Sequence, residues 1–290
     1  MGITEQRFRY DGADGTGLAG FRWRADVRPK AILQLAHGAG EHAGRYLEPL
    51  TPILEAGYVV YAADHRGHGL TAGMSHLGDF GPGGARQAID DMAVLTGRAR
   101  AENPDLPLML MGHSMGAMFC QVYVLEHSHL IDGLVLSGTA APGPMPPGGP
   151  NSAFPNPRTD YDWLSRDDAE VDKYIADPFC GIRFSPESMA SFTALWQRDL
   201  APESLSQVRK GLPIYVFVGD EDPINFRLER LTPLLEAYRS AGLNVSAKIY
   251  AGGRHEMFNE TNRIEVYKDL IAWMDARLAA LPSGPAGSAP

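Results

Sequence analysis

The sequence predicts an α/β fold in which a mostly parallel sheet is flanked by helices. Short apolar runs alternate along the chain with stretches whose apolar residues recur at helical spacing. The runs are continuously apolar, as expected of strands that are buried on both faces of a parallel sheet. Polar, glycine-rich segments follow the runs, at the strand ends where open α/β sheets bind their ligands.

The expected elements follow one another in a regular order. An N-terminal hairpin should pair residues 3–10 with residues 18–24 across a turn rich in glycine and aspartate. The buried strands are expected at residues 31–36, 58–63, 107–111, 133–137, 213–218 and 245–250. The helices are expected at residues 45–56, 84–102, 115–127, 226–241 and 263–279.

One segment interrupts this alternation. Residues 140–157 are dense in proline and glycine, which excludes a helix or a central strand there. Residues 160–208 then look helical and amphipathic. We therefore expect a helical cap inserted over the edge of the sheet, although a set of ordinary packing helices is the alternative. The expected division is an α/β core over 1–139 and 211–280, a cap over 140–210 and a disordered tail over 281–290.

The composition narrows the class of protein. The 290 residues carry a net charge of −9, with 44% hydrophobic and 21% charged residues, as in an ordinary soluble globular protein. The negative charge and the lack of Lys/Arg runs argue against a nucleic-acid surface. The N-terminal segment lacks the apolar region of a signal peptide, and no apolar run reaches the roughly 20 residues of a membrane span. We therefore expect a cytoplasmic protein.

The chain has two cysteines, Cys120 and Cys180, which are too few for a disulfide framework. We expect both to be free, inert thiols, with a single structural bridge as the alternative.

A candidate nucleophile follows the strand expected at residues 107–111. Residues 112–116, Gly-His-Ser-Met-Gly, fit the pattern G-x-S-x-G and open a helical stretch. The pattern describes a tight strand-to-helix turn that exposes the serine hydroxyl, with glycines where a Cβ would obstruct the backbone. Ser114 is therefore the expected nucleophile, and the alternative is a coincidental glycine-rich turn.

A serine hydroxyl needs a base to take its proton, and enzymes with this turn place serine, acid and histidine in that order along the chain. His255 follows the last predicted strand and is the expected base, because the other eight histidines precede Ser114 or follow it by at most 15 residues. Asp220, Glu221 and Asp222 follow the preceding strand and compete as the acid that orients the histidine. Asp222 is preferred, and Asp220 is the next choice.

The oxyanion of a tetrahedral intermediate needs two oriented N–H donors. One should be the backbone N–H of Met115, which follows the nucleophile. The other should come from residues 37–40, after an early strand, where Ala39 is the expected donor.

Three segments together resemble the monoacylglycerol lipase and lysophospholipase group of α/β-hydrolases. They are HGAGEHAGRY at residues 37–46, DHRGHG at 64–69 and the serine motif at 112–116. The similarity continues into the expected cap, at 164–166, 170–172 and 177–178, and covers nearly the whole chain. The resemblance implies an α/β-hydrolase fold with a cap, no cofactor, and the same triad and oxyanion donors.

The resemblance also concerns residues outside the triad. It places Glu41 and Arg45 near the polar headgroup end of the site, although a structural ion pair that braces the loop is equally consistent. Apolar cap residues, Phe179 and Ile182 among them, are expected to line an acyl pocket and to form a rim attractive to a membrane surface. The histidines of 64–69 could suggest a metal site, but in the resembled group this motif is a structural turn, so no metal is expected.

The expected reaction is hydrolysis of a carboxylic ester through an acyl-enzyme. Monoacylglycerol-like or other short- and medium-chain acyl esters are the expected substrates, so the partner is a small acyl ester or lipid and not a nucleic acid. A lysophospholipase, thioesterase, amidase or acyltransferase could use the same triad. A non-catalytic ligand-binding relative is more distant, because such relatives usually lose a triad member. The oligomeric state stays open.

Overall fold

The computed structural model describes residues 2–143, 147–196 and 200–281. Within these residues, eight strands form one sheet in the order β1-β2-β4-β3-β5-β6-β7-β8. The first two strands form an antiparallel hairpin, and β2 pairs antiparallel with β4. The other neighbours pair in parallel, which confirms the predicted mostly parallel α/β sheet.

The described elements have the following bounds. The strands are β1 (Ile3–Asp11), β2 (Gly17–Ala25), β3 (Ala31–Ala36), β4 (Tyr58–Ala63), β5 (Leu108–His113), β6 (Gly133–Ser137), β7 (Pro213–Gly219) and β8 (Asn244–Tyr250). The α-helices are α1 (Thr51–Glu55), α2 (Gly69–Ala72), α3 (Gly84–Glu102), α4 (Met115–His127), α5 (Asp168–Ala176), α6 (Pro186–Trp196), α7 (Pro202–Leu205), α8 (Leu231–Ser240) and α9 (Arg263–Ala279). The short 3-10 helices are η1 (Ala43–Tyr46), η2 (Ser128–Leu130), η3 (Pro150–Ala153) and η4 (Met257–Asn259).

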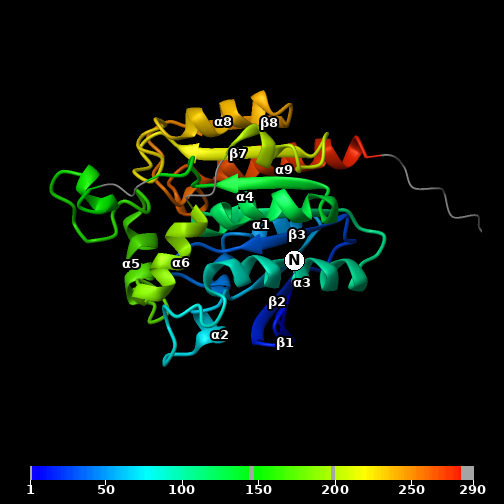
Figure 1. The fold of residues 1–290 in the computed structure, drawn as a ribbon, viewed down its shortest axis with the longest axis horizontal. Helices are drawn as coiled ribbons and strands as arrows, with labels where there is room; N and C mark the ends of the chain where they lie inside the picture. Colours follow the sequence, from blue (N-terminus) through cyan, green and yellow to red (C-terminus); the bar gives the residue numbers. More distant parts are fainter. Residues whose placement is uncertain (1, 144–146, 197–199, 282–290) are drawn as a thin grey trace, which may run out of the picture.

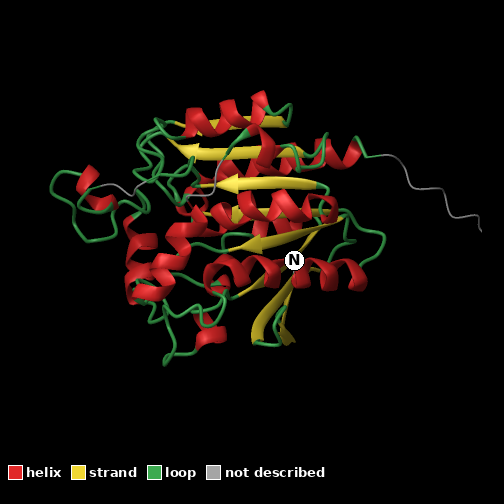
Figure 2. Ribbon diagram, viewed as in Figure 1, coloured by secondary structure: helices red, strands yellow, loops and turns green. Residues whose placement is uncertain are grey.

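Helices cover both faces of the sheet and create two cores. Helices α3, α4 and α8 pack on one face, and α1 and α9 pack on the other (Figures 1 and 2). Successive residues of a strand therefore enter opposite cores, as Ile32 and Leu33 of β3 do. Every residue of β3, β4 and β5 is buried. This double burial explains why the runs are continuously apolar.

Two predicted helices differ from the structure for backbone reasons. A helix over residues 45–56 would hold Pro49 in its interior, where proline removes a hydrogen bond, and the structure instead forms η1 and then α1. The prediction of a helix over residues 226–241 is also wrong about where the helix starts. Phe226, Arg227 and Leu228 have φ angles of 54°, 51° and 77°, so they are left-handed and α8 begins only at Leu231.

Residues 140–210 connect β6 to β7, and their described part supplies no strand to the sheet. Helices α5, α6 and α7 form there in place of the longer helical stretch that the pattern over 160–208 suggested. Helices α5 and α6 lie beyond the carboxyl ends of the strands (Figure 1). We call residues 140–210 the insertion.

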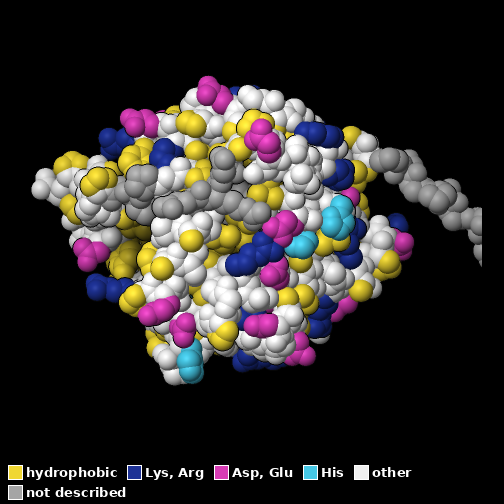
Figure 3. Space-filling model, in the orientation of Figure 1, with side chains coloured by type: hydrophobic (Ala, Val, Ile, Leu, Met, Phe, Trp, Pro, Cys, Tyr) yellow, Lys and Arg dark blue, Asp and Glu magenta, His cyan; other side chains and the backbone are white. Residues whose placement is uncertain are grey.

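The surface agrees with the mixed composition. On the face seen in Figure 3, acidic, basic and apolar side chains are interspersed. Among the described residues, no helix has both the length and the apolarity to cross a membrane. The predicted disordered tail lies, apart from Leu281, outside the described residues.

Candidate active site

Ser114 occupies the turn between β5 and α4. Its φ of 53° and ψ of −120° lie in a region that side chains rarely adopt. Its N–H donates to the Ser137 carbonyl at 2.9 Å, which continues the pairing of β5 with β6. A Cβ on Gly112 would overlap the Gly116 backbone, and one on Gly116 would overlap the Ala36 carbonyl. The two glycines of the motif therefore allow the sharp turn that presents the serine.

His255 and Asp222 meet beyond the ends of β8 and β7. His255 Nδ1 lies 2.9 Å from Asp222 Oδ2, and both side chains are almost completely buried. The other carboxylate oxygen accepts the N–H of Ile224 at 2.9 Å. A carboxylate only accepts, so Nδ1 of the imidazole carries the proton that is shared with Asp222. His255 Nε2 is buried and has no hydrogen-bond partner among the described residues, which leaves its lone pair available.

The other two candidate acids have different partners. Asp220 accepts the N–H of Gly252 at 2.6 Å. Glu221 pairs with Arg227 at 2.9 Å, and both side chains are about half exposed. The geometry therefore favours Asp222 over Asp220 as the partner of the histidine.

The charges around His255 favour its protonated form. Burial alone would lower the pKa of His255, but the Asp222 carboxylate outweighs it, and the nearby Glu256 and Glu41 carboxylates add to the effect. The pKa of His255 is therefore raised above its ordinary value.

Two aromatic residues that the sequence did not single out enclose the histidine. The rings of His113 and Trp163 lie 4.8 and 4.9 Å from the His255 ring, centroid to centroid. Burial lowers the pKa of His113 to about 3, so this ring is neutral, and its Nδ1 lies 3.2 Å from Ser137 Oγ. The position of His113 inside the serine motif could have suggested a role, whereas Trp163 comes from the insertion and carries no such signal.

The candidate oxyanion loop, residues 37–40, runs beside the nucleophile. A Cβ on Gly38 would lie 3.1 Å from Ser114 Cβ. The N–H of Ala39 has no acceptor among the described residues. Met115 is the first residue of α4, where N–H groups lack an intrahelical partner. Both expected donors are therefore free to receive an oxyanion.

Glu41 and Arg45 are engaged with protein groups. One oxygen of Glu41 accepts the N–H of Gly38 at 2.5 Å and the hydroxyl of Tyr46 at 2.7 Å, and the other pairs with Arg45 at 2.5 Å. Glu41 is only 2% exposed. These contacts favour the structural brace over headgroup binding, the two interpretations that the sequence left open.

Arg45 also joins the oxyanion loop to the histidine loop. Its two terminal nitrogens bind the two oxygens of Glu256 at 2.8 and 3.0 Å, across 211 residues of sequence. Burial alone would raise the pKa of Glu256, but the Arg45 guanidinium outweighs it and the pKa is lowered. Because Glu256 follows His255 directly, this bidentate pair fixes His255 relative to the loop at residues 37–40.

The other histidines near the loop act as neutral supports. His37 Nε2 accepts the N–H of His65 at 3.0 Å, so its Nδ1–H donates to the Gly38 carbonyl at 2.8 Å. His68 Nε2 accepts the N–H of Gly40 at 3.4 Å. Burial lowers the pKa of His65 to about 3 and that of His68 to about 4. These contacts fit a structural turn at residues 64–69.

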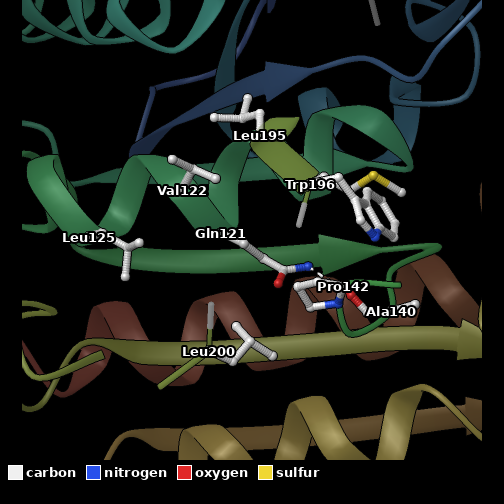
Figure 4. A pocket seen from close by; sticks show the side chains of 9 residues that line it. Gln121, Val122, Leu125, Ala140, Pro142, Leu195, Trp196 and Leu200 are labelled. Atoms are coloured by element: carbon white, nitrogen blue, oxygen red, sulfur yellow. Dashed lines mark hydrogen bonds between the residues drawn. The ribbon is translucent and has the colours of Figure 1, made fainter. Parts of the chain in front are cut away.

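A small apolar cavity of about 20 Å³ begins one helical turn after Ser114. Met118, whose N–H donates to the Ser114 carbonyl at 3.1 Å, belongs to its lining. Leu125 and Trp196 lie at its opposite ends (Figure 4). The full lining is Met118, Gln121, Val122, Leu125, Ala140, Pro142, Leu195, Trp196 and Leu200.

Phe179 and Ile182, the expected pocket residues, lie elsewhere, beside the oxyanion loop. The Phe179 ring meets the His42 ring edge-on at 5.7 Å. The backbone nitrogen of Ile182 would lie 3.6 Å from a Cβ on Gly40. The structure therefore brings these two residues to the loop and not to the lining of the apolar cavity.

Known proteins resemble this chain along most of its length. A family model described as serine aminopeptidase, S33, matches residues 27–262. The monoacylglycerol lipase of Mycolicibacterium smegmatis is 31% identical over 95% of this chain and 99% of its own length. The monoglyceride lipase of Mus musculus is 28% identical, over 94% of this chain and 91% of its own. The structure of a highly thermostable carboxyl esterase from Bacillus coagulans in complex with glycerol has a TM-score of 0.87 at 28% identity, over 95% of this chain and 99% of that one. These matches confirm the predicted fold and the resemblance.

Asp222→Asn should lower kcat for a chromogenic ester by about 10⁴-fold, because an amide would favour the wrong imidazole tautomer. Asp220→Asn is the matched control and should cost far less, since among the described residues the Asp220 carboxylate accepts only a backbone N–H. Steady-state kinetics of both variants measures this difference. A larger loss of kcat in Asp220→Asn than in Asp222→Asn would show that Asp220 is the acid.

Glu256→Gln should shift the acidic limb of the kcat/KM profile to lower pH by roughly one unit. The base must be neutral to work, and the loss of the Glu256 charge lowers the pKa of His255, so activity persists to lower pH. Glu221→Gln, on an exposed acid outside this network, should leave the limb unchanged. If the acidic limb of the kcat/KM profile does not shift in Glu256→Gln, the Glu256 charge does not raise the pKa of His255.

Proposed function

Because the chain belongs to the family described as serine aminopeptidase, S33, we propose that it is a hydrolase whose nucleophile is Ser114. The relatives indicate the bond that it cleaves. They are monoacylglycerol and monoglyceride lipases, and a similar solved structure is a carboxyl esterase. The chain is accordingly a carboxylic ester hydrolase.

One observation carries the assignment of the mechanism. His255 is held by Asp222 through Nδ1, while its buried Nε2 has no partner among the described residues. A buried imidazole nitrogen without a partner is unfavourable unless a group such as a serine hydroxyl uses it. The strained turn that presents Ser114 supports the same conclusion.

In the proposed reaction, His255 Nε2 takes the proton of the Ser114 hydroxyl as Oγ attacks the ester carbonyl. The N–H groups of Ala39 and Met115 stabilise the oxyanion, and Asp222 stabilises the imidazolium. His255 then gives the proton to the departing alcohol, and an acyl-enzyme remains. Water, deprotonated by the same base, attacks the acyl carbonyl and releases the acid.

The apolar residues along α4 support an acyl chain as the apolar part of the substrate, and the small cavity between them would widen when the chain binds. The cavity starts at Met118, near the nucleophile, and its described lining is aliphatic or aromatic except for Gln121. We propose monoacylglycerol-like esters, with the insertion acting as a cap over this cavity. Ile175 and Met189, on α5 and α6, are 47% and 46% exposed and would meet a lipid surface transiently. Phe179 and Ile182 would then line the approach beside the oxyanion loop.

The family description supplies a second candidate function, because it names a peptidase. An amide substrate would use the same triad and oxyanion donors, so the fold does not decide between the two. A panel of ester, thioester and amide substrates with one acyl group separates the activities. Preferred turnover of the amide would favour the peptidase.

Ser114→Ala should reduce kcat for p-nitrophenyl esters by roughly 10⁴- to 10⁶-fold, because no other group would form the acyl-enzyme. A fluorophosphonate probe should label the wild type at Ser114 and leave this variant unlabelled. Ser75→Ala, at an exposed serine, is the control and should keep both activity and labelling. Full activity in Ser114→Ala would refute the proposed nucleophile.

Leu125→Trp should reduce kcat/KM for long-chain esters and spare short-chain esters. Leu125 lies 11 positions after the nucleophile, about 16 Å along the helix axis, so a larger side chain blocks only the far end of the cavity. Val94→Trp, at an exposed site on α3, is the control. Equal losses for all chain lengths would show that the acyl chain lies elsewhere. The measurement is kcat/KM over a series of p-nitrophenyl esters of increasing acyl length.

A further inference from the structure

Three potential metal ligands gather where the oxyanion loop meets the insertion, away from the triad. They are His42, just after the loop, and Asp177 and Cys180 of the insertion. Their ligand atoms all lie within 4.8 Å of one another, and His42 Nε2 lies 2.9 Å from Asp177 Oδ2. All three residues are half-buried, so the cluster is enclosed by protein but reachable from solvent.

We propose that His42, Asp177 and Cys180 bind a Zn²⁺ ion. Imidazole, carboxylate and thiolate are its usual protein ligands, and three of them leave a fourth tetrahedral position for water. Around a tetrahedral zinc, ligand atoms at these bond lengths are about 3.3–3.8 Å apart. His42 Nε2 and Asp177 Oδ2, which are 2.9 Å apart, must therefore move slightly apart, and Cys180 Sγ must approach them by at most about 1.5 Å, within the reach of side-chain rotations.

The backbone already presents the ligands of the insertion together. The N–H of Cys180 donates to the Asp177 carbonyl at 3.0 Å, so the two residues share one turn. Asp177 Oδ1 accepts the N–H of Phe179 at 2.8 Å, which directs Oδ2 towards His42. The N–H of Gly181 donates to the Gly40 carbonyl at 2.9 Å and holds this turn against the oxyanion loop. Little backbone ordering would be needed on binding.

The surrounding charges also favour a cation. A groove open to solvent reaches Asp177 and is lined by charged side chains of both signs. Arg45 lines the same groove, but Glu41 and Glu256 already pair with it. Counted together, the groove and this pair hold five carboxylates and two cations: Asp177, Glu41, Glu48, Glu170 and Glu256 against Arg45 and Lys173. The excess negative charge would attract a dication.

The protons balance on binding. In the metal-free protein, the Nε2–H of His42 is donated to Asp177. Zinc replaces that proton between Nε2 and the carboxylate, and the imidazole carries its proton on Nδ1 instead. The Cys180 thiol loses its proton to solvent and binds as thiolate. One proton is released for each zinc bound, and no redox change occurs.

A bound ion would join the core to the insertion. His42 and Asp177 are 135 residues apart, and the ion would add a link between the loop that carries Ala39 and the insertion. A ligand that binds only the folded chain raises its thermal stability. This expectation does not depend on the proposed ester hydrolysis, so it can be tested without measuring activity.

The test uses the full chain after treatment with a chelator. Titration with Co²⁺ as a spectroscopic substitute should produce a thiolate-to-metal absorption band in the near ultraviolet that saturates at one equivalent. Titration calorimetry with Zn²⁺ should give the same stoichiometry. Cys180→Ser should lose the band, and His42→Asn and Asp177→Asn should weaken binding at least about tenfold. In parallel, Zn²⁺ should raise the Tm of the wild type but not of these variants.

The controls separate this site from others. His129→Asn changes an exposed histidine and should bind as the wild type does. A second cluster, Asp90, Glu126 and His127, lies within the same distance limit, so His127→Asn is included. A band that survives in Cys180→Ser, or binding that is lost in His127→Asn and kept in His42→Asn, would overturn the proposal. Absence of binding in the wild type would also overturn it.

Discussion

The buried ion pair between Arg45 and Glu256 holds together the two loops on which the candidate site depends. The parallel sheet delivers these loops to one edge, but strand pairing ends at Ala36 and at Tyr250, several residues before Arg45 and Glu256. A guanidinium that binds both carboxylate oxygens fixes distance and orientation at once. The same guanidinium binds Glu41, which holds the N–H of Gly38. One cation therefore connects the oxyanion loop to the loop of the base.

Such a pair is stable only as a complete network. Transferring charged groups from water into the protein interior is costly. Removing one partner of a buried ion pair typically lowers the stability of the fold by about 3–5 kcal/mol, because the remaining charge is buried without a counter-charge. Here, the Tyr46 hydroxyl and the Asn259 side-chain amide donate additional hydrogen bonds to Glu41 and Glu256. The negative charge of the network also favours the imidazolium of His255. Structural support and electrostatic tuning of the base thus come from the same groups.

The sequence predicts what depends on neighbours along the chain and misses what depends on distant partners. Strand β3 and helix α3 were predicted with their observed bounds, because continuous burial and helical spacing are local patterns. The start of α8 was not predicted correctly, because the Asn225 side chain accepts the Leu228 N–H and stabilises a left-handed turn. The triad order could be inferred from strand ends, but the role of Arg45 stayed open, since its partner lies 211 residues away.

The insertion shapes the site as much as the core does. The carbonyl of Trp163 accepts the N–H of His255 at 3.4 Å, and that of Leu164 accepts the N–H of Glu256 at 2.7 Å. On the other side, the Tyr174 hydroxyl donates to the Gly40 carbonyl at 2.7 Å. The insertion therefore contacts both the loop that carries His255 and the loop at residues 37–40. Since these two loops must keep their relative position for the proposed chemistry, we expect a change in the insertion to act on turnover as well as on the shape of the apolar cavity.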